Sequence, residues 1–416
     1  MKNKGLIAIV VIIVLAIVGY FVFKPKPETE QAAAPEATAP ADTGTTPAPE
    51  ATAPAQPATT QEAAKAPEVI TIATAGPITG DLAEFGAQMK SGAEKAVADL
   101  NAAGGVMGKQ VKLQVGDDQC DPKQAVAVAN DLVSKGVVFV AGHFCSGSSI
   151  PASAVYHEEG VLQITPASTN PKFTEDPAAA GWKTVFRTCG RDDQQGSFAG
   201  PWIAEHFKGK NAAIVDDKSA YGKGLADLTK EAMNKAGLTE VVHESITAGE
   251  QDYTALVSKL KAANVDVIYF GGYHPEAALI VKQAREQGLN AQLLSGDSLN
   301  TQEFATLAGP AGDGVMFTNA AEARNLPSAK TVVESFRKDG FEPEGYTLAT
   351  YAAIQVWAQA VTKAGTTDSE KVAEAMRGGS WDTVIGKLSF DAKGDLTSST
   401  YVWYEFQGGK YAEAKK

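Results

Sequence analysis

One stretch in the first third of the chain decides the fold: Gly116-Asp-Asp-Gln-Cys120-Asp-Pro, then Lys123 to Lys135, then Val137-Val-Phe-Val-Ala-Gly-His-Phe-Cys145-Ser-Gly-Ser-Ser149. Between Lys123 and Lys135 the apolar residues Ala125, Ala129, Leu132 and Val133 share one face of a helix. The unbroken apolar run Val137–Ala141 is typical of a strand buried on both faces. The stretch therefore predicts a strand–helix–strand unit of a parallel sheet.

Two cysteines follow the two strands of this unit. We expect Cys120 and Cys145 at the carboxyl edge of neighbouring parallel strands, close enough to form a disulfide. Open α/β sheets bind ligands at this edge. The residues Ser146 to Ser149 can begin the next helix with N–H groups and hydroxyls that point at an anion. The prediction is a crosslinked α/β lobe with an anion pocket at its edge.

The first 23 residues suggest export. After Lys2 and Lys4 the chain has no charge from Gly5 to Phe23, a length of roughly 28 Å as a helix, close to the ~30 Å of bilayer hydrocarbon. The run has no Ala-x-Ala near its end and no nearby cysteine for a lipid. We interpret 1–23 as an uncleaved membrane anchor with the lysines inside. A cleaved leader is the alternative, and both imply export.

A Pro/Ala-rich segment separates this anchor from the rest of the chain. Residues 24–67 consist largely of Pro, Ala, Thr and Glu and lack large apolar side chains, so we expect a disordered linker. The remaining stretch of about 350 residues exceeds one typical core, which predicts two lobes. The formal net charge of −12 argues against nucleic acid as a partner.

Strand and helix patterns alternate through most of the folded part. This alternation predicts parallel sheets with helices on both faces, and two such series predict two doubly wound α/β lobes. The predicted strands are 69–75, 110–115, 137–141, 161–164, 212–215, 241–245, 265–270 and 292–294. The predicted helices are 88–103, 123–135, 150–159, 198–207, 225–236, 253–263, 276–287, 329–338, 347–364 and 369–377. Near the end, Leu388–Phe390 and Tyr401–Phe406 suggest an antiparallel hairpin, with Asp391–Asp395 as a turn rather than a calcium loop.

Six loops at strand ends carry polar or aromatic residues, and these suggest binding rather than catalysis. Phe144-Cys-Ser-Gly lacks the nucleophile-elbow glycine, and Tyr221-Gly-Lys-Gly is too short for a phosphate loop. The five histidines show no metal-ligand spacing. We therefore expect no enzyme, no cofactor and no metal. The loops contain Gly76–Gly80, Cys145-Ser146, Thr165–Asn170, Asp217–Gly222, Gly271–Glu276 and Ser295–Ser298.

From about Val69 to Phe406 the chain resembles the periplasmic leucine/isoleucine/valine-binding proteins of ABC importers. The motifs that carry this resemblance are Asp-x-Cys120-Asp-Pro-Lys-Gln-Ala, Gly-His-x-Cys145-Ser, Pro-x-x-Thr-Asn, Asp-Lys-x-x-Tyr-Gly, Ile-Thr-Ala-Gly-Glu-x-Asp, Gly-Gly-Tyr-x-Pro-Glu and Thr-Val-Ile-Gly. The resemblance implies a type I periplasmic binding protein fold with three crossings between the lobes. The lobes would then be 68–190 with 320–398 and 191–319 with 399–416.

The resemblance also implies a ligand site and a role for each residue in it. Ser146 would bind the carboxylate of an α-amino acid, which fits a helix start. Asp297 would bind the ammonium with the Ala167 carbonyl and the Thr169 hydroxyl, next to Ser168. Tyr273 would complete the polar clamp. The apolar wall around the ligand side chain would consist of Phe85, Phe144, Tyr221 and Tyr346.

Three positions depart from the family pattern. Asp297 stands where glutamate is usual, which shortens the reach by a methylene. Phe85 often corresponds to tryptophan and Phe144 to leucine, so the first change opens space and the second removes it. A branched-chain or similar aliphatic L-amino acid is the expected ligand, although a smaller neutral amino acid fits these departures as well.

Each of these residues also has a purely structural interpretation. Ser146 could simply cap a helix, Asp297 could form an ion pair, and Phe85 and Tyr346 could pack the margin of the cleft. The left-over Cys189 is expected to be a quiescent thiol, with redox pairing as the alternative.

The resemblance predicts an ABC-importer binding protein that works with membrane permease subunits. It would act at the periplasmic or extracellular face, tethered to the cytoplasmic membrane. A tethered sensor of amino acids or amides with the same fold is the alternative, because a free shuttle does not need an anchor.

Overall fold

The computed structural model describes residues 69–414, which contain two parallel sheets. The predicted anchor (1–23) and linker (24–67) lie outside the described residues. Among residues 69–414 no helix has the length and apolar character to cross a bilayer. The first sheet has the strand order β2-β1-β3-β4-β5, and the second has the order β14-β13-β10-β9-β8-β6-β7. In the second sheet β13 runs antiparallel to its neighbours β10 and β14, and the other strand pairs of both sheets are parallel.

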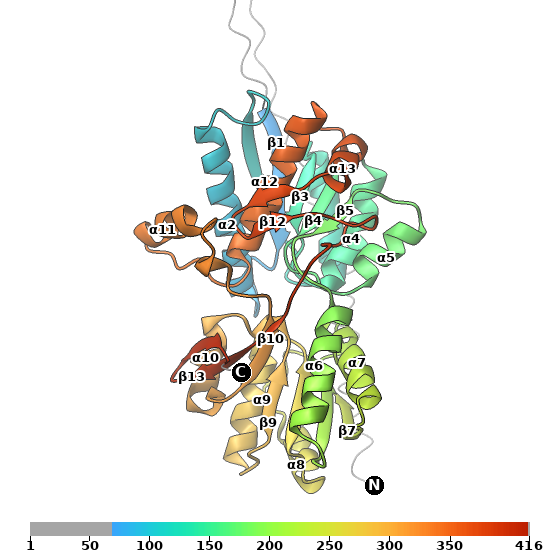
Figure 1. Ribbon diagram of the computed structural model, residues 1–416, viewed down its shortest axis with the longest axis vertical. Helices are drawn as coiled ribbons and strands as arrows, with labels where there is room; N and C mark the ends of the chain where they lie inside the picture. Colours follow the sequence, from blue (N-terminus) through green and yellow to red (C-terminus); the bar gives the residue numbers. More distant parts are fainter. Residues whose placement is uncertain (1–68, 415–416) are drawn as a thin grey trace, which may run out of the picture. The chain divides into compact units, whose positions relative to one another are not determined.

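The elements of the first sheet and its helices come from two separate parts of the chain. In chain order they are β1 (Val69–Gly76), α2 (Ala83–Ala102), β2 (Gln110–Asp117), α3 (Pro122–Ser134), β3 (Phe139–Gly142), α4 (Ser146–Glu158), β4 (Leu162–Thr165), α5 (Lys172–Ala179) and β5 (Val185–Arg187), and after a long interval η3 (Ala323–Asn325), α11 (Lys330–Lys338), α12 (Thr347–Ala364), α13 (Ser369–Arg377), β11 (Trp381–Thr383) and β12 (Gly386–Leu388). Figure 1 shows α12 against the first sheet, and one apolar core contains residues of α12, β1 and β3. The stacked rings of Phe139 and Trp357, 5.1 Å apart, join these parts.

The second sheet and its helices come from the middle of the chain and from its end. In chain order they are α6 (Asp192–His206), β6 (Ala212–Asp216), α7 (Ala220–Lys235), β7 (Glu240–Ser245), α8 (Thr254–Ala262), β8 (Val267–Gly271), α9 (His274–Glu286), β9 (Gln292–Ser295), η1 (Asp297–Leu299), α10 (Gln302–Ala308), η2 (Gly309–Gly312), β10 (Met316–Asn319), β13 (Val402–Gln407) and β14 (Lys410–Glu413). The chain thus passes between the two sheets three times: after β5, after β10 and before β13 (Figure 1). The lobe boundaries at 190, 319 and 398 stay a prediction.

The disulfide between Cys120 and Cys145 is present, but the strands that precede it are not neighbours. The expectation of adjacent strands was wrong, because β1 lies between β2 and β3. The loop after β2 crosses the end of β1, where the Asp118 N–H donates to the Gly76 carbonyl at 3.0 Å. This crossing carries Cys120 to Cys145, with 5.5 Å between their Cα atoms.

The predicted antiparallel hairpin at the end of the chain is also wrong. Strand β12 pairs with β11, whereas β13 pairs with β10 and β14. The two segments belong to different cores: Phe390 packs in the first and Phe406 in the second. The turn between them is confirmed, since Asp391 Oδ1 accepts hydrogen bonds from three backbone N–H groups, those of Lys393, Gly394 and Asp395.

Several helices begin earlier than their apolar pattern predicts. Helices α2, α4, α6 and α7 begin at 83, 146, 192 and 220 rather than at 88, 150, 198 and 225. Their first turns consist mainly of polar and small residues, which carry no apolar periodicity. Short elements such as α5, β5, β10 and β14 were not predicted from the pattern.

We expect the disulfide to matter for stability. Replacing both Cys120 and Cys145 with alanine should lower the free energy of unfolding by about 3–4 kcal/mol, because the crosslink restricts the unfolded chain. Chemical denaturation measures this loss, and wild type under reductant is the matched control. An unchanged denaturation midpoint in both samples would contradict the expectation.

Candidate functional site

A small cavity lies where strand ends of both sheets meet. It is lined by Phe144, Ser146, Ala167, Tyr221, Tyr273, Asp297, Ser298 and Tyr346. Its volume is only about 10 Å³, close to the least that one water molecule requires. The lining side chains therefore fill nearly all of this space. Seven of the ten residues that the sequence predicts for the site line it, and Ser168, Thr169 and Phe85 do not.

Ser146 is the first residue of α4, and the strand before this helix ends at Gly142. The helix is preceded by Cys145 at the N-cap, with no side-chain cap. The interpretation of Ser146 as a helix cap is therefore wrong. Its hydroxyl instead accepts from the Asn170 N–H at 3.3 Å. Because the first N–H groups of a helix have no partner within it, this end of α4 suits a carboxylate.

Asp297 carries a buried carboxylate in the lining of the cavity, with 4% of the residue exposed. Tyr221 donates its hydroxyl to Oδ1 at 3.0 Å, and Tyr346 donates to Oδ2 at 2.7 Å. Burial raises the pKa of this carboxyl group, and the two phenol donors lower it in part. Among the described residues Asp297 has no ion pair, which argues against the structural interpretation of this residue.

Three aromatic rings close the apolar side of the cavity. Phe85 stacks on Phe144 with centroids 4.5 Å apart, and the ring of Tyr346 meets both rings edge-on at 5.5 and 4.9 Å. Phe85 is completely buried behind the other two. It therefore supports the wall without lining the cavity.

Two of the predicted residues, Ser168 and Thr169 in the loop after β4, do not line this cavity. The Ser168 hydroxyl lies 2.8 Å from the Phe144 carbonyl, to which it donates, and 2.6 Å from the hydroxyl of Ser149. Thr169 is buried, and its hydroxyl has no hydrogen-bond partner among residues 69–414. The side chain of Thr169 lines a second, larger cavity instead.

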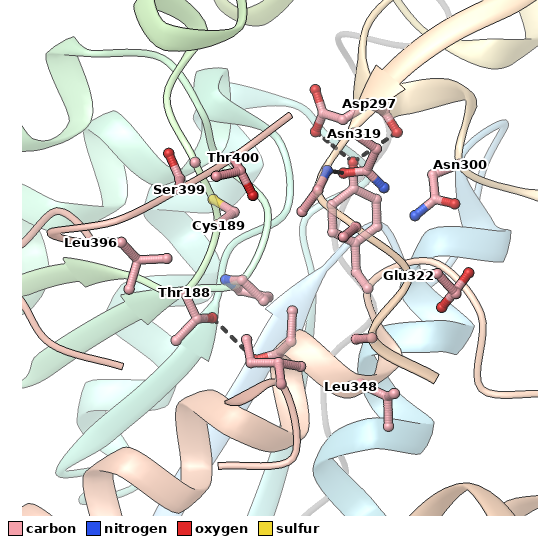
Figure 2. A pocket seen from close by; sticks show the side chains of 18 of the residues that line it. Thr188, Cys189, Asp297, Asn300, Asn319, Glu322, Leu348, Leu396, Ser399 and Thr400 are labelled. Atoms are coloured by element: carbon pink, nitrogen blue, oxygen red, sulfur yellow. Dashed lines mark hydrogen bonds between the residues drawn. The ribbon is translucent and has the colours of Figure 1, made fainter. Parts of the chain in front are cut away.

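This second cavity lies among the three crossings and has a volume of about 310 Å³. Figure 2 shows Thr188 and Cys189 on one side of it and Asp297 and Asn319 on the other. Asp297, Tyr346 and Thr169 belong to its wall, so it adjoins the small cavity. We do not assign the ligand to this cavity on size alone. Only the small cavity is lined both by Ser146, which suits a carboxylate, and by Asp297, which suits an ammonium. Cys189 is free, and burial raises the pKa of its thiol.

Sequence reasoning missed three residues near the site. Asp192 is completely buried in the first turn of α6, and Gln195 in the same helix donates to the Thr318 carbonyl at 2.9 Å. Ser298 lines the cavity, and its hydroxyl donates to the Gly272 carbonyl. The only signal for Asp192 was an acidic residue directly after the first crossing. No group of three or more residues suited to a metal was found in the described part of the chain.

The model of the periplasmic binding protein family matches residues 69–410. The chain belongs to this family. A relative from Brucella melitensis, Leu/Ile/Val-binding protein homolog 1, is 49% identical over 334 residues, which are 80% of this chain and 89% of the relative. An amino acid binding protein from Pseudomonas aeruginosa is 51% identical over 346 residues, 82% of this chain and 91% of the relative.

Solved structures of family members share the fold. A leucine-binding protein from Thermotoga maritima has a TM-score of 0.76 at 28% identity, and the match covers 83% of this chain and 98% of that one. The branched-chain amino acid transporter substrate-binding protein from Streptococcus pneumoniae, solved with isoleucine, has a TM-score of 0.75 at 27% identity with the same coverage. These likenesses confirm the resemblance inferred from the motifs and the type I periplasmic binding protein fold.

The buried charge of Asp297 has a measurable consequence for stability. A carboxyl group whose pKa is raised on folding binds a proton that the unfolded chain has lost, so its contribution to stability falls as pH rises. Asp297→Asn should therefore stabilise the empty protein by roughly 1–2 kcal/mol at pH 8 and by less at pH 5. Thermal unfolding at both pH values measures this, with Asp176→Asn on an exposed turn of α5 as the control. Destabilisation at both values would contradict the burial argument.

Proposed function

We propose that this protein is the extracytoplasmic binding protein of an ABC importer and that it binds a branched-chain or similar aliphatic L-amino acid between its two lobes. The observation that carries the proposal is the buried Asp297 carboxylate, which has no ion pair in the described chain and lines the same cavity as Ser146 at the start of α4. An α-amino acid has the complementary pair of charges. The names of the related proteins support the same ligand class.

In the proposed pose the ligand carboxylate binds the first lobe, and the ammonium binds residues of both lobes. The ligand carboxylate binds Ser146 and the first N–H groups of α4. The ammonium binds Asp297 together with the carbonyl of Ala167 and the hydroxyl of Thr169. Tyr273, at the start of α9, completes the polar clamp beside the ring of Tyr221, 5.2 Å away.

Binding in this pose requires the lobes to open and close. The Tyr346 hydroxyl from the segment before α12 bonds to Asp297 from the second sheet, so one hydrogen bond already joins the two sides across the cavity. An incoming ammonium competes with that phenol for the carboxylate. The ligand then stabilises the closed form through contacts that exist only in that form.

The proposed setting follows from the family and from the N-terminal sequence. The protein hands its ligand to membrane permease subunits at the periplasmic or extracellular face. Residues 1–23 serve as its anchor in the cytoplasmic membrane. The chemistry required is binding alone, with no bond made or broken.

The ligand class is tested by thermal unfolding of wild type with each common amino acid, small amides and sugars. A ligand at ~100-fold above its Kd adds ~2.7 kcal/mol and should raise the midpoint by a couple of degrees or more. We expect a selective shift with neutral aliphatic L-amino acids. A response to amides or sugars alone would overturn the proposal.

Asp297→Ala should weaken binding of the amino acid by at least ~2 kcal/mol, because the ammonium loses its charged partner. Isothermal titration calorimetry measures this change. Asp176→Ala, outside the site, should bind as wild type does. Near-wild-type affinity of the Asp297 variant would refute the role of this residue.

The aromatic wall should set the size of the ligand. Phe144→Leu removes a ring from the stack on Phe85 and enlarges the cavity, so it should improve binding of leucine relative to alanine by about 1–2 kcal/mol. Competition between the two amino acids in wild type and variant measures this ratio. An unchanged ratio would show that the ligand side chain does not meet this wall.

A further inference from the structure

Asp192 is the acidic residue in this region that the proposed pose leaves unused. It is completely buried, and neither oxygen of its carboxyl group has a hydrogen-bond partner among the described residues. The residue does not cap α6, because Arg191 is the N-cap and this helix has no side-chain cap hydrogen bond. Buried polar groups are rarely left without partners, and such groups call for an explanation.

The nearest part of the ligand site is the loop that contains Thr169. The N–H of Asp192 donates to the carbonyl of Thr169 at 2.9 Å, and the N–H of Asn170 donates to the Ser146 hydroxyl. This loop is thus held between Asp192 on one side and Ser146 on the other. The Thr169 hydroxyl is near enough to the Asp192 carboxyl group to lower its pKa, although neither group makes a well-formed hydrogen bond among residues 69–414.

The charges around Asp192 favour its protonated form. Burial raises its pKa to about 8, and the negative charge of Asp297 acts in the same direction. The hydroxyl of Thr169 and the cation of Arg187 act against the rise, but Arg187 is paired with Asp395 at 2.8 Å. The other titratable groups that interact with Asp192 are Asp193 on its own helix, Tyr221, Tyr269, Tyr273, Tyr401 and Cys189.

We propose that Asp192 is a positioning residue for the ligand's ammonium group: its carboxyl group holds the hydroxyl of Thr169 toward the ligand, and the proton that it carries in the empty cleft passes to solvent when the ammonium binds. This inference rests on the proposed function. The Thr169 hydroxyl donates to Asp192 and turns a lone pair to the ammonium. The proton of Asp192 goes to solvent, and the ammonium then supplies positive charge for the carboxylates of both Asp192 and Asp297.

Proton release distinguishes this role from a structural one. L-Leucine and L-alanine are titrated into the full-length protein at pH 7 in buffers of different ionisation enthalpy. With a pKa of about 8, wild type should release roughly 0.9 proton for each bound ligand. Asp192→Asn should release clearly less than wild type, the remainder coming from Asp297, whose pKa burial also raises, whereas Asp176→Asn on the exposed side of α5 should behave as wild type does. Full release in Asp192→Asn would assign the proton to another group and overturn the proposal.

The pH profile of affinity gives a second readout. Between pH 6 and pH 8 the affinity of wild type should rise about tenfold or more, because the ammonium binds the deprotonated form. In Asp192→Asn the rise should be much smaller. Thr169→Val removes a donor that stabilises the charged form of Asp192, so it should shift the rise in affinity to higher pH. This test does not depend on whether Asp192→Asn folds. An unshifted profile in Thr169→Val would overturn the role of the hydroxyl.

A double-mutant cycle tests whether Asp192 acts through Thr169. Asp192→Asn should weaken binding about tenfold in wild type and less than threefold in the Thr169→Val background. Equal factors in both backgrounds would contradict the positioning role. If wild type binds no neutral amino acid, the proposed function and this inference both fail; if wild type binds and only these effects are missing, this inference fails alone.

Discussion

A carboxylate that is buried without a cation is unfavourable unless something else compensates its charge. In this protein Asp297 is in that position, and two phenols, those of Tyr221 and Tyr346, are its hydrogen-bond donors. Phenols donate hydrogen bonds but carry no positive charge, so they stabilise the carboxylate less than an ammonium group would. The closed, ligand-free arrangement is therefore a compromise that a cationic group can improve. In the proposed function this missing positive charge is what makes the cleft select a ligand with an ammonium group.

The topology places the Asp297 carboxylate where the two lobes come together. Asp297 follows a strand of the second sheet, whereas Ser146 begins a helix that follows a strand of the first. The two groups meet only because the chain crosses between the sheets three times and brings both carboxyl edges together (Figure 1). The larger cavity among these crossings (Figure 2) adjoins the small one through Asp297 and Tyr346, which line both. In the proposed function these shared side chains couple movement of the lobes to occupation of the site.

The sequence predicted most of the regular elements because their apolar patterns are strong. Helix α12 was predicted with its observed bounds, and its apolar residues lie in the first core. The first turns of α2, α4, α6 and α7 were missed because their polar and small residues lack an apolar face. The hairpin was predicted wrongly because Phe390 and Phe406 are both apolar, and local pattern does not tell which core each one joins. The order of β2, β1 and β3 was likewise beyond a local pattern.

The same limit applies to the site. Motifs brought out Ser146, Ala167 and Asp297, which line one cavity. They did not bring out Asp192, whose importance depends on burial and on missing partners, and both are properties of the packed structure. Nor did the sequence show that Thr169 lines the larger cavity among the three crossings rather than the small one. Spacing predicts which loops meet at a sheet edge, but not the direction in which each side chain of a loop points.

In the proposed function the ligand's ammonium group supplies the charge that the buried carboxylate of Asp297 lacks. The most direct test is a comparison by isothermal titration calorimetry of L-leucine and L-alanine with 4-methylpentanoate and propanoate, which lack only the amino group. We expect at least one of the amino acids to bind and its deaminated analogue to bind at least about 100-fold more weakly, as for the loss of a charged hydrogen-bonded pair. Equal affinity for an amino acid and its deaminated analogue would contradict the account.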